Sequence, residues 1–118
     1  MKRISVSFLF LLFAVSFIAC NQEITYTEEF NYLPKYEGMV IEDFKEPIEG
    51  QMGIAVYKLK DASPEDVLKK YERLLKKDGW KVTKDNKPAN LTVEKENHQA
   101  TIATSKTEEG TTLTIMSK

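Results

Sequence analysis

The stretch that most constrains the fold is the run from Ser63 to Trp80, SPEDVLKKYERLLKKDGW. Its apolar residues recur at the spacing i, i+1, i+4, i+7, i+8, which places them in one stripe along a helix. Ser63 can cap the first turn, and Pro64 fits the first helical position. Gly79 suits the left-handed residue that ends many helices, with Trp80 folding back after it. The sequence therefore predicts one amphipathic helix that covers a sheet. The stripe consists of Val67, Leu68, Tyr71, Leu74 and Leu75.

The opposite face of the predicted helix is basic. A solvated face is the simpler interpretation, and the alternative is a membrane-facing basic surface close to anionic lipid head groups. The cations of this face are Lys69, Lys70, Arg73, Lys76 and Lys77. Acid–base pairs spaced i, i+4 are also expected, each contributing about 0.2–0.5 kcal/mol. These pairs are Glu65–Lys69, Asp66–Lys70 and Glu72–Lys76.

Short alternating segments surround the helix. Two strand patterns precede it, at residues 39–44 and 52–60, and a run of three or four follows it between residues 80 and 116. This order predicts an α+β fold, an antiparallel sheet of about five strands with the helix on one face, in the order β-β-α-β-β-β. Inward-facing candidates are Trp80, Val82, Leu91, Val93, Ala100, Ile102, Leu113 and Ile115. Outward-facing candidates are Thr92, Thr101, Thr112 and Thr114.

The first twenty residues have the composition of a secretory signal. Two basic residues follow Met1, and the run from Ile4 to Ala19 carries no charge. This run is short for a membrane-spanning helix, which needs about 20 apolar residues. The segment Phe17-Ile18-Ala19-Cys20 resembles the lipobox of bacterial lipoproteins, although that family prefers Leu where this chain has Phe17.

The lipobox resemblance implies a lipid anchor. In that family the cysteine sulfur receives a diacylglyceryl group and the leader is removed, so Cys20 would be the lipidated first residue of the mature chain. Cys20 is the only cysteine, which fits this role. The expected organisation is a lipoprotein signal peptide at residues 1–19, the lipidated cysteine and a tether at 20–32, and one α+β domain at 33–118. The expected location is extracytoplasmic, anchored to a bacterial membrane.

A wider resemblance covers residues 33–116. The segments LPKYEGM, SPEDVLKKYERLLKKDGW and GTTLTI are similar to a pattern found in small uncharacterised envelope lipoproteins of bacteria. The resemblance implies the α+β fold and brings no activity or functional residues.

Charge argues against nucleic-acid binding. Without Lys2 and Arg3 the chain has 15 basic and 18 acidic residues, a net charge of −3, whereas nucleic-acid-binding domains are usually strongly basic. The acids concentrate early, because residues 21–50 hold eight acids and two bases. This asymmetry could place the early segment against the basic helix face, or could be simple solvation.

The sequence shows no catalytic, cofactor-binding or metal-binding motif. The single histidine, His98, lies in a predicted turn, and the carboxylate pairs Glu28–Glu29 and Glu108–Glu109 lie in the predicted tether and a turn. Four aromatic residues precede the first strand, where they either wedge the opening segment onto the domain or form an exposed recognition patch. They are Tyr26, Phe30, Tyr32 and Tyr36.

These observations favour a non-catalytic binding or structural module of the envelope, with the membrane and an envelope protein as expected partners. One alternative is a periplasmic ligand-binding or sensor module with a pocket between helix and sheet. The other is a carboxylate-based hydrolase, which would need a desolvated cleft holding converging acids.

Overall fold

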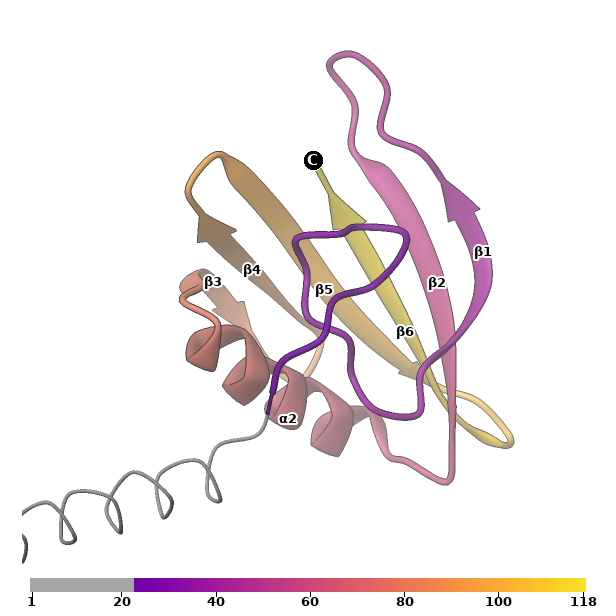
Figure 1. Cartoon of the computed structure of the whole chain (residues 1–118). Coiled ribbons are helices and arrows are strands. Elements are labelled where there is room, and N and C mark those ends of the chain that lie inside the picture. The colour runs from indigo at the N-terminus through magenta and orange to yellow at the C-terminus, as the bar shows by residue number, and fades with distance from the viewer. Residues whose placement is uncertain (1–22) are drawn as a thin grey trace, which may run out of the picture.

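The computed structural model describes residues 23–118, which form a six-stranded antiparallel sheet with one helix across one face (Figure 1). The strand order is β1-β2-β6-β5-β4-β3. The elements are β1 (Val40–Lys45), β2 (Gly53–Lys60), α2 (Pro64–Lys77), β3 (Lys81–Asn86), β4 (Asn90–Lys95), β5 (His98–Lys106) and β6 (Gly110–Ser117). The expected α+β class and antiparallel sheet are confirmed.

The sheet has six strands, so the expectation of about five was wrong. Four strands follow the helix, and the first of them, β3, has a weak pattern because Val82 is its only apolar residue. It pairs with β4 as an edge strand, with a register shift between Val82 and Lys84. The other edge strand, β1, shifts register between Ile41 and Asp43. Bulges and charged residues on edge strands discourage pairing with other chains.

Both ends of α2 form as the sequence predicted. The Ser63 Oγ accepts a hydrogen bond from the Asp66 N–H at 3.2 Å, and proline occupies the first turn. At the other end Gly79 has a φ of +94°. The Trp80 N–H donates to the Leu75 carbonyl at 2.9 Å, and the Gly79 N–H donates to the Lys76 carbonyl at 3.0 Å. This is a Schellman motif, which satisfies the last carbonyls of the helix.

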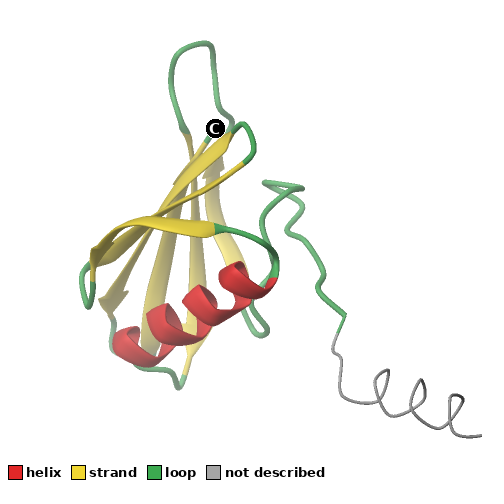
Figure 2. Ribbon diagram, turned by 90° about the vertical axis from the view of Figure 1, so that its left-hand side faces the viewer, coloured by secondary structure: helices red, strands yellow, loops and turns green. Residues whose placement is uncertain are grey.

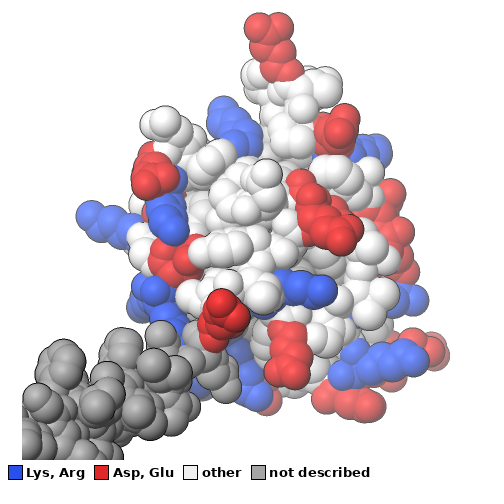
Figure 3. Space-filling view, viewed as in Figure 1, with Lys and Arg blue, Asp and Glu red and all other residues white. Residues whose placement is uncertain are grey.

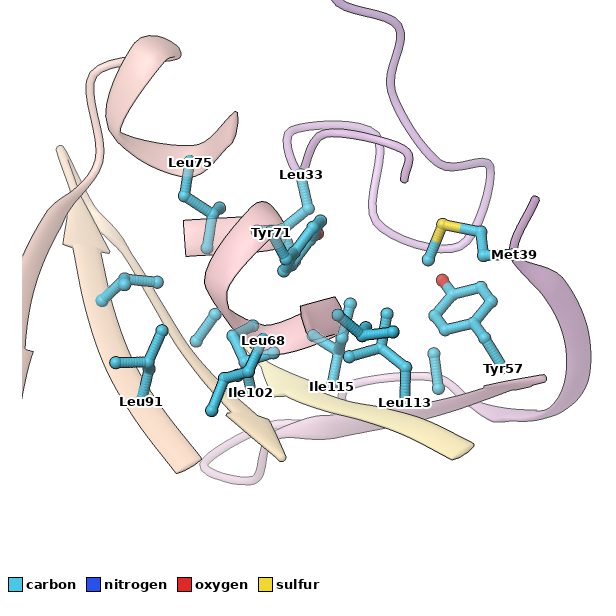
Figure 4. Packing of buried hydrophobic residues seen from close by; sticks show 14 of the residues in the cluster. Leu33, Met39, Tyr57, Leu68, Tyr71, Leu75, Leu91, Ile102, Leu113 and Ile115 are labelled. Carbon is cyan, nitrogen blue, oxygen red and sulfur yellow. The ribbon is translucent and has the colours of Figure 1, made fainter. Parts of the chain in front are cut away.

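The core lies between α2 and the concave face of the sheet, chiefly over β5 and β6 (Figures 2 and 4). Leu68, Tyr71 and Leu75 of the helix are fully buried. Seven of the eight inward candidates are buried, and Val82 is partly buried against the same cluster. On β2, the alternate residues Ala55, Tyr57 and Leu59 also face the core.

The segment before β1 covers the same face of the sheet beside the helix (Figures 1 and 2). Phe30 and Leu33 are buried, and the Tyr71 hydroxyl donates to the Pro34 carbonyl at 2.8 Å. Thr27 is buried and bonds both the N–H and the carbonyl of Phe30. The expected tether at residues 20–32 is therefore corrected from residue 23 onward, because Phe30 packs on the domain and the polar groups around Thr27 find hydrogen-bond partners. Residues 20–22 lie outside the described residues.

The other face of the sheet has no covering layer among residues 23–118 (Figure 2). Residues at alternate positions of a strand point to opposite faces, so the expected outward positions Thr92, Thr101, Thr112 and Thr114 lie here, and all four are half-buried. The two central strands carry no charged residue on this face. Their outward residues are Gln99, Thr101, Ala103, Ser105, Thr112, Thr114 and Met116.

Leu74 is less buried than its place in the predicted stripe implied. It packs against the edge of the core and lines a surface hollow together with Tyr36, while its neighbour Leu75 is fully buried. The helix is rotated so that the centre of its apolar stripe lies nearer Tyr71 and Leu75 than Leu74.

We expect Leu75→Ala to lower the free energy of unfolding by about 2–5 kcal/mol, because it leaves a cavity in a closed core. Leu74→Ala should cost less than about 1.5 kcal/mol, because water can fill the space. Chemical denaturation of both variants measures the difference. Equal losses would contradict the assigned rotation of the helix.

Candidate functional site

The outer face of α2, defined by Lys69, Lys70, Arg73, Lys76 and Lys77, is the predicted basic surface, and all five residues are exposed. Of these five cations, only Lys76 forms an ion pair with a residue in the range 23–118, with Glu72 at 3.1 Å. This confirms one of the three expected i, i+4 pairs. The pairs Glu65–Lys69 and Asp66–Lys70 do not form within 4.0 Å, and these two acids are exposed in the first turn of the helix.

The sequence predicts that Glu72, as a charged residue, lies on the solvated face of the helix. In the structure its side chain is buried instead. Its side chain is 10% exposed and its Oε1 accepts from the Nζ of Lys87, in the turn between β3 and β4, at 2.6 Å. The hydrogen bond from Lys87 lowers the pKa of Glu72. No local signal predicts this contact, because Lys87 is 15 residues away in the sequence. As a result, every exposed charge on α2 between residues 69 and 77 is positive.

The end of α2 is fastened by Asp78, whose side chain is 8% exposed. Its carboxylate accepts hydrogen bonds from the Tyr26 hydroxyl at 2.7 Å and the Trp80 indole N–H at 3.3 Å. The Nζ of Lys95, on β4, donates to the same carboxylate at 3.2 Å and to the Asp78 carbonyl at 2.6 Å. These contacts join the opening segment, the helix end and the sheet.

A hollow of about 560 Å³ separates the start of the described chain from α2. Glu23 and Ile24 line one side of it, and Lys70 and Leu74 of the helix line the other. Lys35 and Glu37 also line it, so the hollow carries two acids and two bases. The described chain thus begins beside the outer face of α2.

A second hollow, of about 440 Å³, lies between the opening segment and the free edge of β1. At its lining the Tyr57 hydroxyl donates to the Glu29 carboxylate at 2.9 Å. Burial, followed by this hydrogen bond, raises the pKa of Tyr57. Val40 and Ile41, two of the exposed large apolar residues, also line this groove.

The four early aromatic residues mainly wedge the opening segment onto the domain. Phe30 is buried, and Tyr32 and Tyr36 pack partly buried against the core, whereas Tyr26 is 44% exposed. His98, expected in an exposed turn, is the first residue of β5 and stacks on Tyr32 with ring centroids 3.5 Å apart. The sequence did not predict this packing partner, because Tyr32 and His98 are far apart along the chain.

The remaining candidates are not brought together. Glu28 and Glu29 line the groove beside β1, whereas Glu108 and Glu109 are exposed in the turn between β5 and β6. Within residues 23–118, no three His, Cys, Asp or Glu side chains cluster in a way that could hold a metal ion. In that same range no helix is long and apolar enough to cross a membrane. Cys20 and the predicted signal peptide lie outside the described residues.

Comparison of the chain with protein-family models, with curated proteins and with solved structures gave no match.

We expect Glu72→Gln to lower the free energy of unfolding by about 1–2 kcal/mol near pH 7, because it removes the carboxylate from two lysines. The pKa of Glu72 is lowered in the folded state, so the unfolded state binds more protons in acid. The stabilisation is present above the ordinary pKa of 4.5 and is lost as the pH falls through the lower folded value.

Denaturation curves of wild type and Glu72→Gln should therefore converge in acid. Glu65→Gln, an exposed acid on the same helix, is the matched control and should change the stability by less than about 0.5 kcal/mol. A constant difference between wild type and Glu72→Gln at every pH would contradict this assignment.

Proposed function

We propose that this chain is a lipid-anchored, extracytoplasmic module of a bacterial envelope, which binds or supports another envelope component without catalysing a reaction. Its sequence support is the basic start, the uncharged run from Ile4 to Ala19 and the lipobox-like segment ending at Cys20. Each buried CH₂ of an acyl chain contributes about 0.8 kcal/mol to membrane binding, so two or three chains on one residue make the attachment stable.

The observation that carries this proposal is that the packed part of the chain begins within seven residues of the expected anchor, at Thr27. Thr27 is buried, and the Thr25 carbonyl accepts from the Lys35 N–H at 2.7 Å. Glu23, the first described residue, is three residues from Cys20, a span of at most about 11 Å. A lipid on Cys20 would therefore hold the domain at the membrane surface rather than at the end of a long linker.

A ligand-binding module is the second candidate function. The space between α2 and the sheet, where the sequence placed a pocket, is filled by fully buried side chains such as Leu68 and Ile102. The groove beside β1 supports this candidate instead, because it combines apolar residues with the Tyr57–Glu29 pair. The hydrolase hypothesis depends on the same groove, where Glu28 and Glu29 are the available carboxylates.

We expect the wild-type protein from its native membrane to lack residues 1–19 and to carry a diacylglyceryl mass on Cys20. It should partition into detergent. Mass spectrometry of the N-terminal peptide checks both changes. Cys20→Ala should lack the added mass, whereas the control Asn21→Ala should keep it. A wild-type protein with an unmodified Cys20 or an intact leader would refute the anchor.

A further inference from the structure

We propose that the outer face of α2 binds the anionic head groups of the membrane that holds the domain. The orientation rests on the proposed anchor at Cys20. The protein would then lie with its helix toward the lipid, and the uncovered face of the sheet would point away from it.

The start of the described chain determines which side of the domain meets the membrane. Glu23 and Ile24 lie across a hollow from Lys70 and Leu74 of α2. Figures 1 and 2 both show the described chain beginning on the side of the helix that faces away from the sheet. Cys20 lies within about 11 Å of Glu23 along an extended chain. An anchor at Cys20 therefore brings this side, and not the edge at β1, to the lipid.

The charge of this side matches an anionic surface. Between residues 69 and 77 every exposed charge on α2 is positive, because Glu72 is turned inward and paired with Lys87. Of the five cations of the outer face, four form no ion pair within 4.0 Å among residues 23–118. Each Lys or Arg close to an anionic leaflet strengthens binding by about fivefold. This attraction falls off over a Debye length of about 8 Å, so it acts only when the helix lies close to the lipid.

The acids near this surface lie at its margins. Glu65 and Asp66 are exposed in the first turn of α2, and Glu23 and Glu37 line the hollow, where Lys35 and Lys70 balance them.

The opposite edge of the sheet is acidic. Glu42 and Asp43 of β1 are exposed, with Glu42 paired to Lys58 at 3.2 Å, and acidic side chains gather over this strand in Figure 3. An anionic membrane repels this edge while it attracts the helix. Both forces turn α2 toward the lipid.

The test uses the chain from Cys20 onward, the expected mature form, coupled through its single thiol to a maleimide lipid in vesicles. This attachment does not depend on natural lipidation, so its result is separate from the result of the Cys20 mass measurement. One vesicle contains phosphatidylcholine alone, and the other contains equal parts of phosphatidylcholine and phosphatidylglycerol. An amine-reactive footprint read by mass spectrometry reports which lysines the membrane protects.

We expect Lys69, Lys70 and Lys77 to react at least about fivefold more slowly on the anionic vesicles than on the neutral ones. Lys60 and Lys106, on strands away from the outer face of α2, should react equally on both. Equal reaction of the helix lysines on the two vesicles, or equal protection of all lysines, would overturn the proposal. Either result would favour an acidic protein as the partner of this face.

Binding of the uncoupled protein to anionic vesicles tests the same surface by substitution. Lys69→Gln, Lys70→Gln, Arg73→Gln and Lys77→Gln together should weaken binding at least about tenfold. The charge-matched control changes Lys45, Lys60, Lys106 and Lys118 to glutamine and should weaken it less than about threefold. Equal losses in the two variants would refute a specific role for α2. If the helix variant does not keep the denaturation midpoint of wild type, the footprint on the unaltered chain decides.

Discussion

The rest of the structure depends on the contact between one helical stripe and the concave face of the sheet. Leu68, Tyr71 and Leu75 bury fully against β5 and β6, and the chain has no disulfide to assist them because it has a single cysteine. Tyr71 has a second role, since its hydroxyl bonds the Pro34 carbonyl at 2.8 Å. The helix therefore holds the sheet on one side and the opening segment on the other, and loss of its packing would release both.

The opening segment closes the part of the core that α2 leaves open. Phe30 and Leu33 seal the part of the sheet that α2 does not reach, and Asp78 links Tyr26 to the helix end and to Lys95 of β4. The start of the described chain is thereby placed beside α2. The proposed orientation at the membrane follows from this placement as much as from the charge of the helix.

Most of the fold could be predicted from the sequence, because the relevant signals are local. The period of the helical stripe, the caps at Ser63 and Gly79 and the alternation of the strands each depend on residues a few positions apart. The errors concern contacts between distant residues. Glu72 was expected to be solvated, but it pairs with the distant Lys87. The segment around Phe30 was expected to be a tether, but it packs on the sheet.

The same distinction applies to the candidate site. The sequence predicted that the five cations on α2 form a basic face. It did not predict how close this face lies to Glu23, the first described residue. That distance depends on the hollow between Glu23 and Lys70, 47 residues apart in the numbering. The groove beside β1 could not be predicted from the sequence either, because Glu29 and Tyr57 meet only after the opening segment folds back.

The uncharged outer face of β5 and β6 has a consequence of a different kind. Hydroxyl and methyl groups of residues such as Thr101 and Thr114 neither titrate in the neutral range nor attract counterions. Contacts made on this side would persist in brine or in mild acid, whereas those of the lysine-bearing helix would weaken as salt rises. The salt concentration would therefore change the contacts on one side of this small domain and leave those on the other side unchanged.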